Sequence, residues 1–306
     1  MDIRLINKGA EELQHVIKNH NNLPAQYTPG ELSKSAPYFG YINIAISGVS
    51  PFVMFSNNDD FVAQSFFWKG SDAYEPLSLR IWSILAKKSP GILDIGSYSG
   101  IYSLAAAKAN SKAKVYAFEA LNRVFTRLII NKNVNQCGNI KAFNQAVSDS
   151  NGNVEFNIYA GESILVSGSS ILEKNTNRDI YEKISIKSVT IDDFIQNESP
   201  PKIGLLKIDT EGAEHQVIQG AKKLIHNNKP DILCEFLGGA KTGQIEKMLS
   251  GLGYRYIQIN EKTMEFIETE HLTPGNGMDN LNTLITQRSV SELSQLLLPA
   301  NSTTMD

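Results

Sequence analysis

The sequence predicts an α/β fold in which a mostly parallel β-sheet carries helices on both faces. Helical and strand patterns alternate from Glu75 onward, which is typical of parallel strands connected by crossover helices. The strands in this part are short and apolar, as expected for strands buried on both faces. Small-residue turns follow them, and the turn at residues 96–100 contains two glycines. These observations together predict a doubly wound sheet preceded by a separate N-terminal region.

Composition and charge limit the classes of protein that fit. The chain has 306 residues, of which 42% are hydrophobic and 20% charged, as in an ordinary folded protein. A net charge of -3 without long runs of either sign argues against a nucleic acid or an anionic membrane as the main partner. No segment approaches the roughly 18 apolar residues of a membrane span, and residues 1–8 lack the apolar core of a secretion signal. Cys137 and Cys234 fit small buried residues, so we expect a cytoplasmic protein.

The predicted elements divide the chain into three parts. Residues 1–72 are expected to hold a helix at 10–19, a loop-rich stretch that includes Pro29 and Gly30, and a hairpin of strands 41–46 and 51–55. Residues 73–288 open with a helix at 76–88, and Pro76 fits its first turn. Strands are then expected at 91–95, 114–119, 140–147, 154–158, 184–189, 203–208, 231–236, 254–259 and 282–286, with helices at 101–109, 123–134, 213–226 and 244–252.

Two further segments have their own predictions. Residues 161–170 form a long Gly/Ser-rich loop, and a loop of this length predicts a substrate lid. Residues 289–306 are expected to form a C-terminal helix, over 289–298, and a tail. The helix is amphipathic, so it either packs on the body of the protein or contributes to a homodimer contact.

The turn after the first strand of the alternating region indicates a ligand site. Gly96 and Gly100 allow the backbone to approach a ligand and offer N–H groups at the start of a helix, where a carboxylate is favoured. Asp94 at the end of the strand is placed to meet an ammonium through water. A dinucleotide site would need Gly-x-Gly-x-x-Gly, which Ser97 and Tyr98 interrupt, and Asp94 would repel a pyrophosphate. The turn therefore favours a cationic ligand such as S-adenosylmethionine over a dinucleotide.

Two positions further along extend this site toward an adenosine group. Glu119 ends the second strand, where its carboxylate can accept hydrogen bonds from both ribose hydroxyls. This position does not separate nicotinamide cofactors from methionine cofactors, because both carry a ribose diol. Asn144, Gln145 and Ala146 follow the third strand, where side-chain amides or a backbone N–H could bind the adenine edge.

A third block of residues carries the candidates for proton removal. Asp209 and Glu211 follow the strand at 203–208, and the carboxyl end of such a strand is where ligands bind in open α/β sheets. His215 has the intrinsic pKa of a general base, and its position four residues after Glu211 would put both on one helix face. Each also has a structural alternative: His215 as a surface residue, Asp209 as a support of the turn, and Glu211 as a helix cap. Together with Glu235 the two acids could bind a divalent cation, but separate hydrogen-bonding roles are commoner, so no metal is predicted.

The ordered blocks resemble the FkbM family of methyltransferases between about residues 74 and 259. The matching residues are Tyr74-Glu75-Pro76, Asp94-Ile95-Gly96, Phe118-Glu119, Asn144-Gln145-Ala146-Val147-Ser148-Asp149 before Gly152, Val189-Thr190-Ile191-Asp192-Asp193-Phe194, and Lys207-Ile208-Asp209-Thr210-Glu211-Gly212-Ala213-Glu214. The resemblance implies a Rossmann-like class I methyltransferase fold with a mostly parallel seven-stranded sheet over residues 73–288. Ser97-Tyr98 in place of Ala-Asn, and Ala120 in place of proline, depart from the usual pattern, and residues 1–72 match no motif of the family.

The resemblance also implies a reaction and a set of site residues. The reaction is methyl transfer from S-adenosylmethionine to a hydroxyl of a sugar or specialised metabolite, so a small-molecule or carbohydrate acceptor is expected. A dinucleotide-dependent oxidoreductase, or a cofactor-binding protein without turnover, are the alternatives. The predicted catalytic residues are Asp209, Glu211 and His215, and the predicted cofactor-binding residues are Glu75, Asp94, Gly96, Ser97, Tyr98, Gly100, Glu119, Ala120, Asn144, Ala146 and Asp209.

Overall fold

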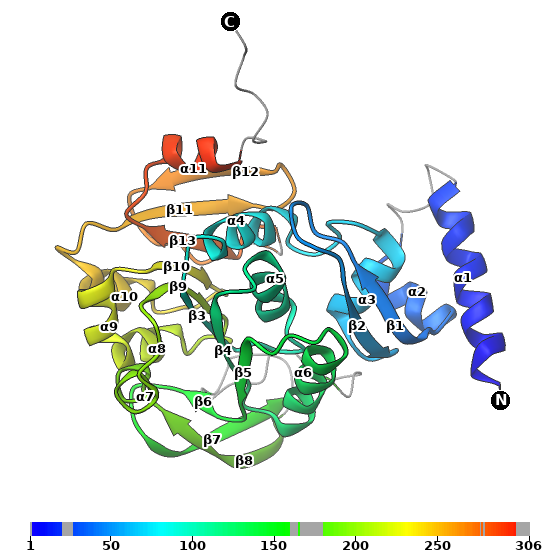
Figure 1. Cartoon of the computed structure of the whole chain (residues 1–306), viewed down its shortest axis with the longest axis horizontal. Coiled ribbons are helices and arrows are strands. Elements are labelled where there is room, and N and C mark those ends of the chain that lie inside the picture. Colours follow the sequence, from blue (N-terminus) through cyan, green and yellow to red (C-terminus); the bar gives the residue numbers. More distant parts are fainter. Residues whose placement is uncertain are drawn as a thin grey trace, which may run out of the picture.

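The computed structural model is built around one large sheet (Figure 1). It describes residues 2–19, 27–159, 165, 180–275, 277 and 279–297. The sheet has eight strands in the order β12-β11-β13-β10-β9-β3-β4-β5. Its strands are β3 (Gly91–Ile95), β4 (Lys114–Phe118), β5 (Ile140–Phe143), β9 (Ile203–Ile208), β10 (Asp231–Glu235), β11 (Arg255–Asn260), β12 (Glu265–Thr269) and β13 (Asn282–Thr286). The pairs from β10 to β5 are all parallel, whereas β13 runs antiparallel between β10 and β11.

Helices cover both faces of this sheet, as predicted, and each face has its own apolar core. Successive strand residues point to opposite faces, so Ile92 belongs to one core and Leu93 to the other. The first core lies beneath α4 (Pro76–Ala86), α5 (Ile101–Ala109) and α6 (Asn122–Val134). The second lies beneath α7 (Ile191–Glu198), α8 (Glu214–Gly220), α9 (Lys222–Asn228) and α10 (Thr242–Leu249). This double burial explains why the strands read as nearly continuous apolar runs.

The prediction of seven strands was wrong by one for the described part of the chain. Strand β12 pairs antiparallel with β11 and forms the edge of the sheet. Its side chains are mostly exposed or partly exposed, so it has neither the apolar run nor the clear alternation that predicts a strand. The extra strand lies at the opposite edge from β5 and does not alter the order of the central strands.

Two other predicted elements are each divided in the structure. The predicted strand at 140–147 separates into β5 and β6 (Ala146–Val147), and β6 joins a second sheet with β8 (Ile180–Val189) and β7 (Gly152–Tyr159). The predicted helix at 213–226 separates into α8 and α9, because Ala221 has non-helical backbone angles. Gly220 lies at this break, and a β-carbon there would be 2.1 Å from the Ser148 carbonyl oxygen. The predicted lid at 161–170 lies outside the described residues, apart from Leu165.

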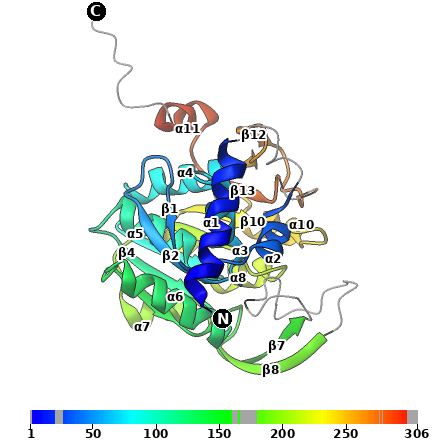
Figure 2. The ribbon, with the colours of Figure 1, turned by 90° about the vertical axis from the view of Figure 1, so that its right-hand side faces the viewer.

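The N-terminal region contains more helix than the sequence predicted. It holds α1 (Ile3–Asn19), α2 (Pro29–Ser35), the antiparallel strands β1 (Phe39–Ile44) and β2 (Phe52–Asn57), and α3 (Phe61–Lys69). The hairpin is confirmed, but Pro29 and Gly30, expected in a loop, begin α2 behind a capping box of Thr28 and Glu31. Helix α3 was not predicted; it buries Phe66, Phe67 and Trp68 in the core. Figure 2 shows α1 lying across this region, where the Asn7 side chain bonds the Phe39 backbone.

Helix α6 connects the N-terminal region to the sheet. The amide of Asn131 accepts a hydrogen bond from the Phe55 N–H at 2.7 Å and donates to the Ser99 carbonyl at 2.8 Å. Arg127 forms a buried ion pair with Asp59, its two nitrogens lying 2.9 and 3.0 Å from the carboxylate oxygens. Strand β2 is thereby held against the turn that follows β3.

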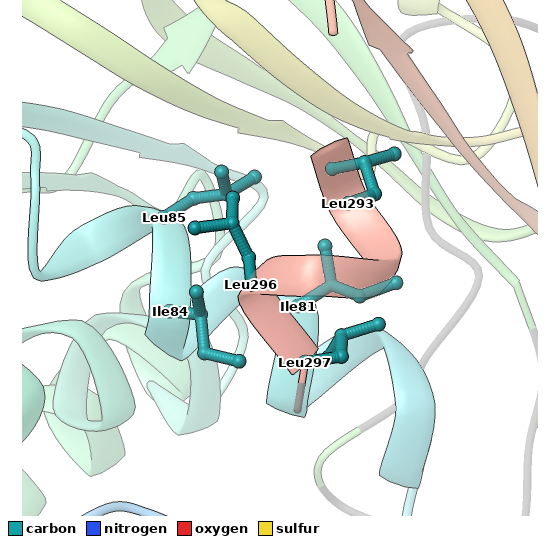
Figure 3. Close-up of a pocket in the computed structure, with 6 residues that line it drawn as sticks. All are labelled: Ile81, Ile84, Leu85, Leu293, Leu296 and Leu297. Carbon is teal, nitrogen blue, oxygen red and sulfur yellow. The ribbon is translucent and has the colours of Figure 1, made fainter. Parts of the chain in front are cut away.

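The C-terminal helix α11 (Val290–Leu297) packs on the body of the protein. Figure 3 shows its leucines facing α4 across a small pocket that is lined entirely by aliphatic side chains, namely Ile81, Ile84, Leu85, Leu293, Leu296 and Leu297. This pocket offers no polar group to a cofactor. Of the two alternatives for this helix, packing on the body is confirmed; the homodimer stays a prediction.

Neither cysteine is paired, and both are buried. Among the helices that the structure describes, none combines the length and the apolar character needed to cross a bilayer.

Candidate active site at the carboxyl ends of the central strands

The parallel strands bring most predicted site residues to one edge of the sheet. Strands β10, β9, β3 and β4 are consecutive in the sheet and run in the same direction, so their carboxyl ends lie along the same edge. The turn at 96–100 follows β3, Glu119 follows β4, Asp209 follows β9, and Glu235 ends β10. This is the edge at which open α/β sheets bind ligands.

The turn after β3 is held by its own hydrogen bonds. The N–H groups of Gly96 and Ser97 both donate to the Phe118 carbonyl, at 3.0 and 2.9 Å, and the Gly100 N–H donates to the Ser97 carbonyl at 2.9 Å. The Ser97 hydroxyl donates to the Asp94 carbonyl at 2.7 Å. The expectation that the glycines themselves offer free N–H groups is therefore wrong. Their role is conformational, because Gly96 and Gly100 have φ of 78° and 101°.

Three predicted site residues that are not glycine also have left-handed backbones. Glu75, Tyr98 and Glu211 have φ of 39°, 49° and 58°. Such conformations are uncommon for residues with a side chain and tend to cluster at functional sites. Glu75 has the additional restriction of preceding a proline, Pro76.

Asp94 is a buried carboxyl group beneath the turn. It is 1% exposed, and the Ser103 hydroxyl donates to its Oδ2. Burial raises its pKa to about 6, against the lowering effects of the Ser103 hydrogen bond and the Lys207 charge. An ammonium group could therefore reach Asp94 only through an intermediary such as the predicted water. The water-mediated contact itself stays a prediction.

Glu119 has its carboxylate fixed in place by two backbone groups. The Tyr98 N–H donates to one oxygen at 3.0 Å, and the Leu121 N–H donates to the other at 2.8 Å. Burial raises the pKa of Glu119 to about 7, although both hydrogen bonds oppose this shift. The carboxylate is thus oriented, mostly buried and directly beside the turn after β3.

Asn144 lies next to Glu119 and supports its backbone. Its Nδ2 donates to the carbonyls of Glu119 and Ala120, both at 2.9 Å. An adenine contact by this amide would therefore have to use its oxygen. Ala146 belongs to a small apolar cluster with Ala120 packed against it; the other members include Leu121, Val124, Phe156, Ile158, Leu165 and Ile186.

Lys207 is a buried cation that the sequence analysis left without a role. Its side chain is 1% exposed, and its Nζ lies 3.2 Å from Asp209 Oδ2 and 3.3 Å from Asn282 Oδ1. The same nitrogen lies 5.0 Å from the centre of the Tyr102 ring, and the Tyr102 hydroxyl donates to Glu75. Burial would lower the pKa of Lys207, but the nearby carboxylates raise it above the ordinary value. A lysine inside the apolar run Ile203–Ile208 was the signal that could have revealed this cluster.

Three carboxyl groups gather beside this lysine. Oxygens of Asp209, Glu211 and Glu235 all lie within 4.8 Å of one another. The Asp209 side chain is 23% exposed, whereas Glu235 is buried. Burial and the neighbouring Asp209 raise the pKa of Glu235 well above its ordinary value. The structure therefore brings together two of the three predicted catalytic residues and adds Glu235.

The third predicted catalytic residue, His215, is not part of this carboxyl cluster. Its Nε2 lies 3.4 Å from Lys241 Nζ, and burial followed by that positive charge lowers the pKa of His215. The predicted common helix face of Glu211 and His215 is wrong, because α8 begins only at Glu214. Glu214, rather than Glu211, accepts the N–H groups of the turn, at 2.8 Å from the Gly212 nitrogen.

Glu75 does not cap α4 with its side chain. That function belongs to Glu261, whose carboxylate accepts hydrogen bonds from the N–H groups of Leu77 and Ser78 at 2.8 and 3.2 Å. The Glu75 carboxylate instead accepts a hydrogen bond from Tyr102 and contributes negative charge near Lys207.

A family model matches this part of the chain. The methyltransferase FkbM domain aligns with residues 94–256, which is more than half of the protein and spans the turn after β3, Glu119, Asp209 and Glu235. The chain belongs to the FkbM methyltransferase family. The resemblance carried by the sequence blocks is therefore confirmed, and with it the α/β methyltransferase fold.

Two curated relatives of this FkbM family member carry names that describe an activity. It is 30% identical over 156 residues to the 2-O-methyltransferase NoeI of Sinorhizobium fredii, covering 48% of this chain and 63% of that protein. It is 25% identical over 166 residues to the hexuronic acid methyltransferase AglP of Haloferax volcanii, covering 54% of this chain and 63% of that protein. The matched part thus spans less than two thirds of either relative.

Solved structures with a similar arrangement are more distant. The crystal structure of methyltransferase FkbM from Methylobacillus flagellatus matches with a TM-score of 0.42 and 14% identity, covering 64% of this chain and 43% of that chain. An O-methyltransferase from Bacillus cereus matches with a TM-score of 0.41 and 12% identity, covering 69% of this chain and 81% of that chain.

Proposed function

We propose that this protein is an S-adenosylmethionine-dependent O-methyltransferase that methylates a hydroxyl group of a sugar or specialised metabolite. Family membership supports methyl transfer in general. The observation that carries the cofactor assignment is the Glu119 carboxylate, fixed by the Tyr98 and Leu121 N–H groups beside the turn after β3. The names of the two relatives, one a 2-O-methyltransferase and the other a hexuronic acid methyltransferase, favour a carbohydrate acceptor.

The residues present fit the chemical groups of S-adenosylmethionine. Glu119 would bind the ribose diol, and the apolar cluster around Ala146 and Ala120 would accept the adenine ring. The first turn of α5 would face the methionine carboxylate, because the turn itself uses its N–H groups internally. Glu75 would attract the ammonium directly, and Asp94 would do so from beneath the turn. When bound, the cofactor supplies a methyl group on a positively charged sulfur.

The residues of the chain would position the acceptor and remove a proton from its hydroxyl. We assign the second task to the carboxyl cluster rather than to His215. Asp209 combines partial exposure with a position beside the cofactor turn, since its N–H donates to the Ile95 carbonyl at 2.9 Å. A Glu211 oxygen lies within 4.8 Å of an Asp209 oxygen, so Glu211 would be close to the same acceptor group. Lys241 beside His215 disfavours a protonated imidazolium there, so this histidine is poorly placed to hold the abstracted proton.

The domain boundaries, the cellular compartment and the partners also belong to this proposal. Residues 1–72 would form an extension, residues 73–288 the methyltransferase domain, and residues 289–306 a C-terminal helix and tail. The protein would work in the cytoplasm, without a nucleic-acid partner. The Glu119 carboxylate alone would also suit the ribose of a nicotinamide dinucleotide, but the buried Asp94 beneath the turn disfavours a pyrophosphate.

Calorimetry followed by an acceptor screen tests the proposal. We expect heat of binding with S-adenosylmethionine and S-adenosylhomocysteine, and none with nicotinamide dinucleotides. A panel of glycosides and hydroxylated aromatic compounds, assayed for release of S-adenosylhomocysteine, should then include at least one acceptor. Binding of a nicotinamide dinucleotide in place of S-adenosylmethionine would support the oxidoreductase. Binding without transfer to any acceptor would support a cofactor-binding protein without turnover.

A further inference from the structure

Asp209 and Glu235 lie side by side because their strands are adjacent. Strands β9 and β10 pair in parallel, with Ile208 opposite Cys234, so the next residue of each strand falls at the same level. Oxygens of the two carboxyl groups lie within 4.8 Å of one another. An ionised carboxylate only accepts hydrogen bonds, so the two groups can bond each other only when one of them holds a proton.

The charges that surround this pair favour one proton between the two groups. Lys207, on the same strand as Asp209, is a single buried cation in contact with Asp209 Oδ2 at 3.2 Å. Among the described residues, the other charged or titratable groups that act on the pair add no positive charge; they are Glu75 before α4, Tyr74, Asp94 of β3, Tyr102 of α5, Glu119, Glu211, Glu214 of α8 and Cys234 of β10. Ionising several carboxyl groups around one ammonium in a buried site costs much free energy, because the like charges repel and are poorly solvated. The Lys207 contact favours the negative charge on Asp209, and burial raises the pKa of Glu235, so we assign the shared proton to Glu235.

We propose that Asp209 and Glu235 act as one proton-sharing pair, positioned by Lys207, that receives the hydroxyl proton of the methyl acceptor. This inference rests on the proposed function; it adds Glu235 to the predicted catalytic residues and Lys207 as a positioning residue. Asp209 is the member that meets the acceptor, because it is 23% exposed. Glu235 is buried and delocalises the proton, while Lys207 is a positioning residue that does not touch the acceptor.

The reaction balances with these groups alone. A lone pair of the acceptor oxygen forms the new bond to the methyl carbon as the carbon–sulfur bond breaks, and that electron pair stays on sulfur. The hydroxyl proton passes to Asp209, so the pair ends with two protons. The positive charge lost from sulfur is matched by the negative charge lost from the pair, so the net charge of the site is unchanged during the step.

The same three carboxyl groups are spaced closely enough to bind a divalent cation. The ammonium of Lys207 argues against this, because it already places a positive charge 3.2 Å from one of the oxygens. Metal binding is therefore an outcome that the experiment has to separate from proton sharing.

Infrared difference spectroscopy of the protein without cofactor or acceptor tests the pair directly. At neutral pH, the difference between wild type and Glu235→Gln should contain the carbonyl stretch of a protonated carboxyl group, shifted in D2O. Asp231→Asn is the matched control, because Asp231 begins the same strand and is paired with Arg288 at its far end. This control should leave the band unchanged. Asp209→Asn provides a second route if Glu235→Gln does not fold, and it should weaken the band, because the Asp209 charge keeps Glu235 protonated.

Failure of the proton-sharing pair can be distinguished from failure of the proposed function. A difference spectrum of wild type against Glu235→Gln without such a band would overturn the proton-sharing pair even if the protein binds S-adenosylmethionine, because the signals of other protonated carboxyl groups cancel in the difference. Stoichiometric binding of Mn²⁺, detected by electron paramagnetic resonance and lost in Glu235→Gln, would replace the pair by a metal site. The expected band together with no binding of S-adenosylmethionine would leave the pair in place and refute the methyltransferase assignment.

Discussion

Gly96 and Asp209 approach each other so closely that a β-carbon on Gly96 would lie 1.7 Å from the Asp209 carbonyl oxygen. The contact joins the turn after β3 to the end of β9, and the Asp209 N–H donates to the Ile95 carbonyl at the same place. The proposed cofactor site and the proposed proton acceptor are thus parts of one rigid arrangement. The glycine is required both by this contact and by its φ of 78°.

Gly96→Ala should therefore damage binding and stability together. The added methyl group must displace the Asp209 backbone, and the residue must also adopt a strained conformation. We expect the midpoint of thermal unfolding to fall and the affinity for S-adenosylhomocysteine to drop at least about tenfold, equivalent to about 1.4 kcal/mol. Gly138→Ala is the control, since a β-carbon there meets nothing within 4 Å. Equal effects of the two substitutions would show that the contact is unimportant.

Glu119→Ala should weaken cofactor binding without unfolding the protein. The ribose hydroxyls would lose a charged acceptor, which is worth roughly 1.5–3 kcal/mol. Calorimetric titration with S-adenosylhomocysteine measures this loss, and Glu265→Ala on the exposed edge strand β12 should show none. Unchanged affinity in Glu119→Ala would mean that the ribose binds elsewhere.

The raised pKa values of Glu119 and Asp94, to about 7 and about 6, predict how stability depends on pH. Both exceed the ordinary carboxyl values of 4.5 and 3.8, so the folded protein holds these protons more tightly than the unfolded chain. Their contribution to stability is complete below the ordinary values and is lost as the pH rises through the folded ones. Between roughly pH 5 and 8, the midpoint of thermal unfolding should decline as the pH rises, and the decline should be shallower in Glu119→Gln than in wild type. A decline of the same slope in both proteins would remove Glu119 as its source.

Cofactor binding should have the opposite dependence on pH. Ribose hydroxyls donate to the ionised form of Glu119, so affinity for S-adenosylhomocysteine should rise as the pH passes about 7 and then level off. Titrations at about pH 6.5, just below the pKa of Glu119, in two buffers with different ionisation enthalpies should detect release of a proton on binding. Proton uptake would contradict the assigned direction.

Asp209→Asn should reduce turnover more than cofactor affinity. Removal of a general base typically lowers the rate by about 10²–10⁴-fold. The comparison of kcat on an acceptor identified by the screen with the Kd for S-adenosylhomocysteine separates the two roles. If affinity falls more than kcat, Asp209 belongs to the cofactor site.

Lys207→Met should destabilise the fold, because it leaves buried carboxyl groups without their cation. Breaking a buried ion pair costs roughly 3–5 kcal/mol. Urea unfolding at pH 7 should show this loss, and the loss should shrink at lower pH as the carboxyl groups take up protons. Lys202→Met, at an exposed position before β9, is the control and should change stability little.

The sequence predicted the parts of the site that depend on local pattern. Asp94 is next to the last residue of its strand and Glu119 and Asp209 directly follow theirs, and parallel strands bring such positions to one edge. Contacts between segments that are distant in the sequence could not be predicted from local patterns. Glu261 bonds the Leu77 N–H across 184 positions of sequence, and nothing near either residue indicates the pairing.

The pairing of Lys207 with the carboxyl cluster was missed for a similar reason. A lysine in an apolar strand indicates a buried charge but not its partners. Only the fold shows that Asp209, Tyr102 and Asn282 surround Lys207. The left-handed backbone of Glu211 was also unforeseen, because its spacing of four residues from His215 was taken to put both on one helix face. Residues before Glu75 gave weaker patterns still, which is why α3 was not predicted.

The binding of S-adenosylhomocysteine tests the central claim most directly. Calorimetric titration of the wild-type protein should show saturable binding at one site per chain, no heat with NAD⁺ under the same conditions, and clear weakening in Glu119→Ala. Absence of heat with both S-adenosylhomocysteine and S-adenosylmethionine, from a protein shown to be folded, would contradict the account.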